Sequence, residues 1–327
     1  MKSRALVIIF IILVALIWPA NPFDLSTTNT IIPPGATGKN VSDILRANKV
    51  LSFYSPFLVS VKIFRLHNRI KAGEYAFSPS DPLFKIVWKL TRGEVVPQKE
   101  VRVTFPEGAS IYRMGMILNE NGFTNWENFQ QLVEEGIAAD LRERHRNIFR
   151  YISSESLEGY LFPDTYQFFP AASAGTMAEV MVDRFDQLVM PLWERSKKDT
   201  KLSLHEIMTL ASIIEKEARV PRERPIIASV FYNRLRIGMP LAADPTVKYA
   251  LERPTKVVYF DQLKIDSPYN TYKKRGLPPG PICNPGIDSI KAAIYPAKTD
   301  YLFFVASMDG SHRFSRTWQE HQRARTR

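Results

Sequence analysis

The sequence predicts an α+β protein with an N-terminal transmembrane helix, a small α+β subdomain and a larger α+β domain. Three observations support this. An unbroken apolar run from Ala5 to Trp18 follows Lys2 and Arg4. An extended stretch, a Pro/Gly turn and a short amphipathic helix occur twice, at a constant offset of 73 residues. The rest of the chain alternates helical periodicity with short strands and long loops rich in proline and glycine.

The composition excludes several classes of protein. The chain has 327 residues, of which 45% are apolar and 12% aromatic, so it can bury a large core and is not of the disordered type. A formal net charge of +11 favours an anionic neighbour, but no zinc-finger, recognition-helix or RNA-binding signature indicates nucleic acid as a partner. The single cysteine, Cys283, precludes an intrachain disulfide and is expected to be an apolar filler. The five histidines are scattered, so we expect no metal site and no cofactor.

Residues 1–20 have the pattern of a signal peptide or of an uncleaved membrane anchor. Trp18 and Pro19 stand where signal cleavage needs small residues, which favours the anchor. The apolar run of 14 residues is short for a span, and Pro19 and Ala20 extend it only slightly. The cationic flank stays in the cytoplasm, so the rest of the chain is expected outside it. Residues 21–30 are polar and turn-rich, and we expect them to form a stalk.

Residues 31–105 are expected to form the small α+β subdomain. Its first half, "PPGATGKNVSDILRANKV", matches "PEGASIYRMGMILNENGF" at the start of the larger domain. Between the two copies lies a strand, a turn and a helix, for which Ser80 or Asp81 is the expected N-cap and Gly93 the expected end. Polysaccharide binding and a plain spacer role both remain open. The matched pairs of the repeat are Gly35 with Gly108, Ala36 with Ala109, Thr37 with Ser110, Ile44 with Ile117, Leu45 with Leu118 and Asn48 with Asn121.

The stretch "LEGYLFPDTYQF", residues 157–168, mixes carboxylates with aromatic rings. Carbohydrate sites use this mixture, because aromatic faces pack on sugar rings while carboxylates bond to their hydroxyls. Glu158, Asp164 and Tyr166 are therefore candidate substrate-binding residues. An ordinary edge strand followed by a turn explains the same composition.

A later helix contains "ASIIEKEA", residues 211–218, with two carboxylates inside an apolar run. Ser203 and Glu206 form a predicted capping box at its start, and Pro221 stops it. At about 100° per residue, Glu215 and Glu217 fall on opposite shoulders of the apolar face, so they cannot act as a pair on one bond.

Each of these glutamates is bordered by apolar side chains, which raises the pKa of a carboxyl group and suits a general acid. The helical wheel does not decide which one has that role. Ion pairing with Arg219, Arg222 or Arg224 is the structural alternative for both.

A second helix ends at Gly238, and the loops "DPTVKYA", "SPYNTY" and "GLPPGPICNPG" precede a predicted strand "YLFFVAS". Long loops stiffened by proline and glycine are costly to order unless they shape a site.

Together, "EGYLFPDTYQF", "ASIIEKEA", "ASVFYNRLRIGMPLAADPTVKYA", "SPYNTYKKRGLPPGPICNPG" and "SIKAAIYPAKTDYLFFVA" resemble the endolytic murein transglycosylase family (MltG, YceG-like), in order from about residue 31 to the C-terminus. The resemblance implies a LysM-like subdomain at 31–105 and a catalytic YceG-like domain at 106–327. It implies cleavage of nascent peptidoglycan glycan strands between N-acetylmuramic acid and N-acetylglucosamine, which ends glycan elongation. It also implies a single-pass protein of the inner (cytoplasmic) membrane with a periplasmic catalytic domain, and peptidoglycan synthases as candidate partners.

The resemblance assigns the family's catalytic glutamate to the second acid of the motif, Glu217. It also implies that the loops form the walls of the substrate cleft, without giving their side chains individual roles. Cys283 stands in the proline-rich loop where the family requires no thiol, and the tail is shorter than in some relatives. The full set of candidate substrate-binding residues is Glu158, Asp164, Tyr166, Asn233, Asp244, Thr246, Tyr269, Asn270 and Tyr272.

One carboxyl group is enough for a lytic transglycosylase, because the sugar's own C6 hydroxyl replaces water and has a high effective molarity. Two alternatives remain at this stage. A muramidase-type hydrolase needs a second carboxylate, for which Asp164, Glu158 and Asp244 are candidates. A non-catalytic, membrane-anchored scaffold would bind glycan while Glu217 is structural.

Overall fold

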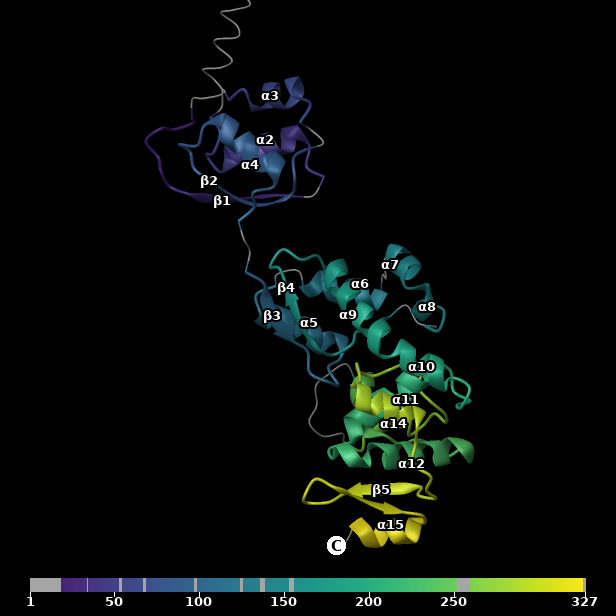
Figure 1. The fold of residues 1–327 in the computed structure, drawn as a ribbon. Coiled ribbons are helices and arrows are strands. Elements are labelled where there is room, and N and C mark those ends of the chain that lie inside the picture. Colours follow the sequence, from purple (N-terminus) through teal and green to yellow (C-terminus); the bar gives the residue numbers. More distant parts are fainter. Residues whose placement is uncertain are drawn as a thin grey trace, which may run out of the picture. The chain divides into compact units, whose positions relative to one another are not determined.

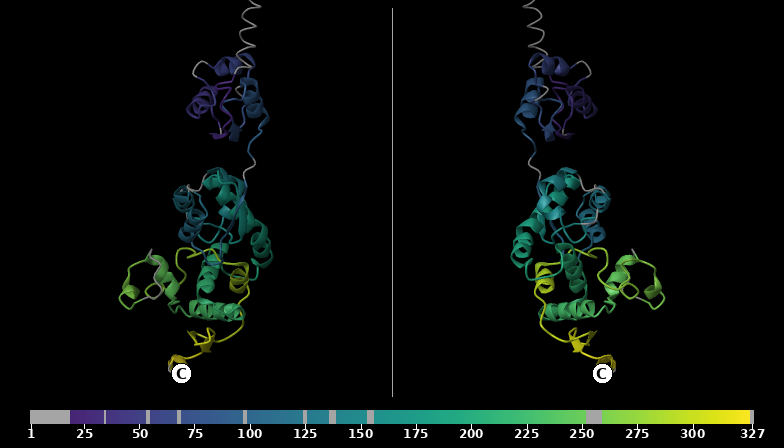
Figure 2. Two further views of the ribbon diagram at one scale, coloured as in Figure 1. Left: turned by 90° about the vertical axis from the view of Figure 1, so that its left-hand side faces the viewer. Right: turned by 90° about the vertical axis from the view of Figure 1, so that its right-hand side faces the viewer.

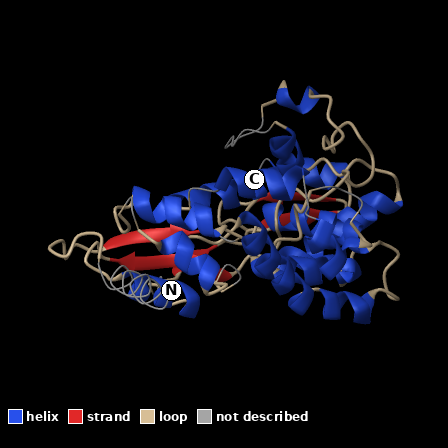
Figure 3. Cartoon of the chain, turned by 90° about the horizontal axis from the view of Figure 1, so that it is seen from above, coloured by secondary structure: helices blue, strands red, loops and turns tan. Residues whose placement is uncertain are grey.

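The computed structural model describes residues 19–33, 35–52, 55–66, 69–96, 99–123, 126–135, 139–152, 156–251 and 259–325. The chain divides into two compact units, and the boundary in the sequence lies between Lys99 and Glu100. Helices predominate in both, and the described strands form three two-stranded sheets (Figures 1 and 3). This mixed α+β content confirms the predicted class. The boundary lies before residue 106 because β3 (Val101–Thr104) pairs with β4 (Thr165–Phe168) of the second unit.

The first unit contains β1 (Thr28–Ile32), α2 (Gly38–Ala47), α3 (Phe57–Ile63), β2 (Gly73–Phe77) and α4 (Leu83–Arg92). β1 and β2 are antiparallel, with Thr28 opposite Phe77. Alternate residues of both strands point inward, where they meet apolar side chains of the three helices. Helix α4 ends at Gly93, which adopts the left-handed conformation at φ +73° as predicted. Its N-cap is Pro82, since Asp81 instead accepts a hydrogen bond from the Ser78 amide.

The predicted stalk at residues 21–30 is wrong. β1 begins at Thr28, and the segment before it is bonded to the first unit. The Asn21 amide donates to the Pro79 carbonyl at 2.8 Å, and the Ser78 hydroxyl donates to the Asp24 carbonyl at 3.0 Å. The polar residues of this segment satisfy their backbone groups against a turn that lies more than 50 residues later, which local composition does not reveal.

The repeat appears in the structure as the same local fold in both units. A strand leads into a glycine with positive φ, and then into a helix capped by a hydroxyl, α2 in one unit and α5 (Ile111–Glu120) in the other. Thr37 and Ser110 accept the hydrogen bond of an amide three residues on. Asn48 and Asn121 each donate to the carbonyl four residues earlier, at 2.9 and 2.8 Å. The equal spacing of the two copies therefore gives α2 and α5 the same kinds of N-cap and C-cap.

The second unit is built mostly of helices around one apolar core. Helix α11 (Leu204–Glu217) packs against α12 (Arg224–Arg236), α13 (Asp244–Ala250) and α14 (Ile287–Ile294). α13 and the 3-10 helix Gln262–Lys264 project from one side of this unit (Figure 2). The predicted strand appears as β5 (Phe303–Ala306), paired with β6 (His312–Ser315). The other elements are α6 (Trp126–Glu135), α7 (Ala139–Arg144), α8 (Arg146–Phe149), α9 (Ala174–Leu188), α10 (Met190–Ser196), α15 (Trp318–Arg325) and the short 3-10 helices Pro221–Glu223 and Gln262–Lys264.

Within the described residues, no helix has the length and apolar character needed to cross a membrane. The predicted anchor at residues 1–20 lies outside them, except for Pro19 and Ala20. Membrane anchoring therefore remains a prediction.

Candidate active site

Helix α11 begins with the predicted capping box. The Ser203 amide donates to Oε2 of Glu206 at 2.8 Å, and the Glu206 amide donates back to the Ser203 hydroxyl at 3.3 Å. Every residue from Leu204 to Ile214 except Glu206 is buried, so the helix runs through the core. Glu217 is its last residue, and Ala218 leaves the helix in an extended conformation. The partial negative charge of a helix C-terminus opposes ionisation of a carboxyl group there.

Glu217 has the electrostatic character of a general acid. Burial raises its pKa to about 7, and the negative charge of Asp244 adds to the rise. Arg234, Lys248 and Arg219 act in the opposite direction. The side chain keeps partial solvent contact, which a reacting group requires. Among the described residues, no hydrogen bond or ion pair engages its carboxyl group.

Asp244 and Tyr272 lie in the same site. Asp244 is the first residue of α13, and it accepts a 2.5 Å hydrogen bond from the Tyr272 hydroxyl. Burial, followed by this hydrogen bond and the charges of Asp244 and Glu217, raises the pKa of Tyr272 far above its usual value. The tyrosine therefore stays protonated and acts as a donor. The charges of these two candidates and of Glu217 thus act on one another, while contact with a substrate stays a prediction.

Arg234 belongs to this site, although sequence reasoning did not select it. Its guanidinium donates from Nε to the Leu302 carbonyl at 2.7 Å and from Nη1 to the Leu241 carbonyl at 2.5 Å. Burial lowers its pKa, while Tyr272 and Glu217 act to raise it. Arg234 continues the buried stripe of Ile227 and Phe231 on α12. An arginine in an apolar helical stripe was the signal that could have identified it.

Glu215 has a structural partner, unlike Glu217. Its Oε1 lies 3.5 Å from Nη2 of Arg224, and its Oε2 accepts the Gly286 amide at 3.1 Å. The Glu215 side chain is 8% exposed. Arg224 also donates to the Ser289 hydroxyl at 3.0 Å, which ties α11, α12 and α14 together. The ion-pair alternative considered for both glutamates therefore applies to Glu215.

Glu158 is a buried structural carboxylate. It accepts the Ile111 amide at 3.2 and 3.1 Å, at the start of α5, and Nδ2 of Asn284 at 2.9 Å. Asn284 also accepts the amides of Gly159 and Leu161 and donates to the Ala109 carbonyl. The aromatic-acidic stretch is thus anchored from inside, and Glu158 is directed away from solvent rather than toward a substrate.

Asp164 and Tyr166 likewise have protein partners. Oδ2 of Asp164 lies 2.8 Å from Nε of Arg184, and its Oδ1 accepts the Thr165 amide at 2.7 Å. The Tyr166 hydroxyl donates to the Phe162 carbonyl at 2.6 Å, and its ring is buried in β4. The edge-strand interpretation of this stretch is confirmed, because among the described strands β4 pairs with β3 alone.

The remaining candidates hold the loops in shape. Thr246 is buried and its hydroxyl bonds to Ala243 and Thr271. The amide of Asn270 donates to two carbonyls of the preceding loop, at 2.9 and 2.8 Å, and its carbonyl oxygen accepts the Tyr272 amide at 3.0 Å. This bond positions the tyrosine that contacts Asp244. The Tyr269 ring packs on Tyr249 at a centroid distance of 4.9 Å.

Asn233 lines an open pocket of about 330 Å³ between α12 and residues 296–300, and its side-chain amide donates to the carbonyls of Thr299 and Tyr301. Cys283 is buried, and burial raises the pKa of its thiol, as expected of an apolar filler. In the part of the chain that the structure describes, no cluster of three His, Cys, Asp or Glu side chains could hold a metal ion.

Comparisons with known proteins identify the family of this chain. The sequence model of the YceG-like family matches residues 30–327. The endolytic murein transglycosylase of Bacillus subtilis is 36% identical over 318 residues, which cover 95% of this chain and 87% of that protein. A protein of the same name from Streptococcus pneumoniae is 28% identical, and the match covers 92% of this chain and 59% of that protein.

The fold also has a solved counterpart. A crystal structure of a yceG-like protein from Listeria monocytogenes superposes with a TM-score of 0.62 at 35% sequence identity. The superposition covers 91% of this chain and 98% of that one. The family model matches nearly the whole chain, and the Bacillus subtilis relative is 36% identical to it. This chain therefore belongs to the YceG-like family.

Proposed function

We propose that the chain is an endolytic lytic transglycosylase that cleaves the bond between N-acetylmuramic acid and N-acetylglucosamine in peptidoglycan glycan strands. The observation that carries the proposal is Glu217, a partly exposed residue whose carboxyl group has its pKa raised by burial to about 7. Near neutral pH such a group is protonated in a large fraction of molecules, yet its conjugate base is strong enough to accept a proton. The names of the relatives from Bacillus subtilis and Streptococcus pneumoniae support the same substrate.

The reaction needs one carboxyl group and no water. Glu217 donates its proton to the glycosidic oxygen as the bond between that oxygen and C1 of the muramic sugar breaks. The resulting carboxylate accepts the proton of the sugar's C6 hydroxyl as its oxygen bonds to C1. This step forms a 1,6-anhydro ring and restores the protonated acid. The bound sugar holds its C6 oxygen near C1, so intramolecular attack has the advantage of proximity.

The residues around Glu217 set its proton affinity. Asp244 favours the protonated form, while Arg234 and Lys248 stabilise the carboxylate that forms after proton donation. Tyr272 holds Asp244 through its hydroxyl, and Asn270 holds Tyr272 through its backbone. We propose that Asp244, Arg234, Lys248 and Tyr272 line the catalytic centre with Glu217, and that Asn270 supports Tyr272. We propose that Asn233 and Tyr269 contact the glycan farther along the strand. Asp164 and Tyr166 are proposed to form part of the wall of the substrate cleft.

The hydrolase alternative requires a free second carboxylate. Asp164 pairs with Arg184, Glu158 is buried, and Asp244 accepts a hydrogen bond from Tyr272.

The decisive experiment is mass spectrometry of fragments released from purified glycan strands by the full-length protein. We expect internal cleavage and 1,6-anhydro-N-acetylmuramic ends, lighter by one water than hydrolysis products, with a rate that EDTA leaves unchanged. Reducing N-acetylmuramic acid as the main end would establish the hydrolase instead.

We further propose that residues 1–20 anchor the chain in the cytoplasmic membrane as a single pass, with both units on the outer face. The cationic residues Lys2 and Arg4 before the apolar run support this orientation. In that position the enzyme would end glycan elongation beside peptidoglycan synthases, with the first unit as a LysM-like glycan-binding module. Full-length protein in the membrane fraction is the expected result, and a soluble mature form that begins near residue 21 would contradict the anchor.

A further inference from the structure

Helix α3 presents an apolar surface to solvent. Phe57, Ser60 and Val61 are buried against the first unit. Leu58, Val59 and Ile63 point the other way, with exposed fractions of 38%, 54% and 57%. Phe64, directly after the helix, is 55% exposed. A surface helix normally has mostly polar residues on its outer side, so an outer side that is mostly apolar indicates contact with something other than water. We call these four exposed side chains, Leu58, Val59, Ile63 and Phe64, the α3 face.

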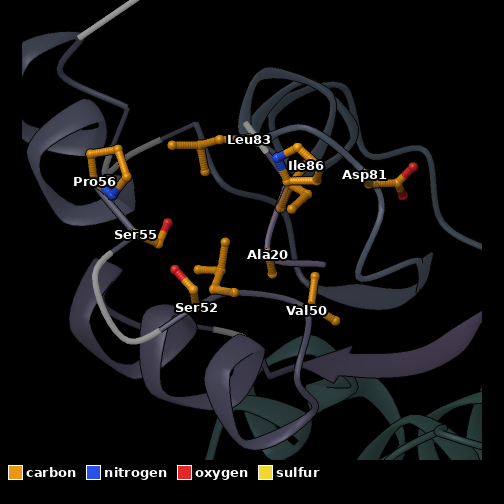
Figure 4. Close-up of a pocket in the computed structure, with 10 residues that line it drawn as sticks. Ala20, Val50, Ser52, Ser55, Pro56, Asp81, Leu83 and Ile86 are labelled. Carbon is orange, nitrogen blue, oxygen red and sulfur yellow. The ribbon is translucent and has the colours of Figure 1, made fainter. Parts of the chain in front are cut away.

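The α3 face lies at the end of the first unit where the described chain begins. Pro19 and Ala20 line a pocket of about 180 Å³ together with Ser55 and with Pro56, the N-cap of α3. Figure 4 shows Ala20, Ser55 and Pro56 around this space, and Figure 1 shows α3 at the opposite end of the unit from β1 and β2. The described chain therefore begins, at Pro19, beside the start of α3.

The charged side chains of the segment that forms the α3 face are all cationic, although Asp81 lines the neighbouring pocket. Residues 55–69 contain the cations Lys62, Arg65 and Arg69 and no Asp or Glu. Lys62 lies among the exposed apolar residues of α3, and Arg65 and Arg69 follow it, all three exposed to solvent. Apolar side chains flanked by lysine and arginine are the composition that binds the interface of a membrane with anionic phospholipids.

We propose that the α3 face rests in the headgroup region of an anionic phospholipid membrane, the same membrane that residues 5–18 enter. This inference rests on the proposed anchoring and adds a second contact to it. A helix of 14 residues spans about 21 Å, less than the roughly 30 Å of a hydrocarbon core. An interfacial helix beside it supplies additional apolar burial. It also fixes the first unit against the bilayer instead of leaving it free to rotate about Pro19.

The test uses full-length protein reconstituted into vesicles of phosphatidylglycerol and phosphatidylethanolamine. A cysteine at Val59 or Ile63 is labelled with an environment-sensitive nitrobenzoxadiazole dye, and quenching is measured with nitroxide-labelled lipids. The matched control is Asn29→Cys, an exposed position on β1 of the same unit. Cys283 is buried, and unsubstituted protein gives its background labelling. We expect blue-shifted, lipid-quenched emission at 59 and 63, and neither change at 29.

Flotation of the same vesicles separates this inference from the anchor. Protein that floats while dye at 59 behaves like dye at 29 overturns the α3 contact and leaves the anchor in place. Protein that does not float overturns both. A blue shift at 59 that depends on protein concentration and is insensitive to nitroxide lipids shows contact with a second copy, which also overturns the inference. As a further check, Lys62→Glu should weaken quenching at 59 in anionic vesicles, and equal quenching would remove the electrostatic part of the argument.

Discussion

The hydroxyl of Tyr272 donates a 2.5 Å hydrogen bond to Oδ1 of Asp244, and the charge of Asp244 raises the pKa of Glu217. Tyr272 belongs to a loop, Asp244 begins α13 and Glu217 ends α11. The proton affinity of the proposed acid thus depends on three segments that only the folded chain brings together. The predictions below test this dependence and the different roles of the neighbouring carboxylates.

Glu217→Gln should abolish cleavage, because glutamine has the same shape but no acidic proton. Loss of a general acid typically lowers the rate by about 10²–10⁴-fold. The matched control is Glu215→Gln, which lies two residues away and weakens the contact with Arg224, so its effect should be smaller. Release of soluble fragments from glycan strands measures both. An inactive Glu215→Gln beside an active Glu217→Gln would reverse the assignment.

Glu217→Gln should also stabilise the second unit at alkaline pH. The folded-state pKa of Glu217 is about 7 against 4.5 in the unfolded chain, so the folded protein binds more protons between these values and stability falls as pH rises through them. Above pH 7, ionisation of Glu217 lowers the free energy of unfolding by about 2 kcal/mol. The full pKa shift corresponds to roughly 3 kcal/mol, and the partial exposure of the residue reduces this value. Thermal unfolding at pH 8 and pH 4 measures it. A higher melting temperature for the variant at pH 8 is expected, with little difference at pH 4, and equal stability at both would refute the raised pKa.

Two substitutions that remove charges of opposite sign near Glu217 should shift the pH dependence of activity in opposite directions. The protonated form of Glu217 is the active one, so kcat/KM should decline as pH rises through about 7. Asp244→Asn removes a charge that raises the pKa of Glu217, and the decline should begin at lower pH. Lys248→Gln removes a charge that lowers the pKa, and the decline should begin at higher pH. Shifts of the same sign in both variants would show that the charges do not act through Glu217.

Glu158→Ala should lower stability more than it alters the chemistry. The variant leaves the Ile111 amide and the Asn284 side chain buried without their acceptor, which costs about 2–4 kcal/mol. The comparison variant is Asp164→Ala, whose side chain is 34% exposed beside Arg184, and a pair of this kind contributes at most about 1 kcal/mol. Chemical denaturation measures both. A fully stable Glu158→Ala protein with weakened glycan binding would restore the substrate-contact role predicted from the sequence.

Sequence reasoning succeeded where structure depends on near neighbours. The capping box of Ser203 and Glu206 depends on residues within one helical turn, and it forms as predicted. The apolar border of Glu217 is also local, because it arises from residues three and four positions earlier on the same helix.

The same reasoning failed where partners are distant in sequence. Glu158 looked like a surface carboxylate because its acceptor role depends on Asn284, 126 residues later. The segment 21–30 looked like a stalk because its partners Ser78 and Pro79 follow the next strand. Arg234 was overlooked because its charge suggested a solvated position, whereas carbonyls of Leu241 and Leu302 bond its guanidinium in the interior.

The position of Asn284 constrains the order of events during synthesis. All its side-chain partners lie at least 123 residues earlier in the chain, and Ala109 lies 175 residues earlier. The interior joined by Asn284 therefore closes only after most of the second unit has left the ribosome. Closure between such distant segments is slow compared with the formation of single helices. Under the export proposed above, such a delay would keep the nascent second unit unfolded while it passes through a translocation channel.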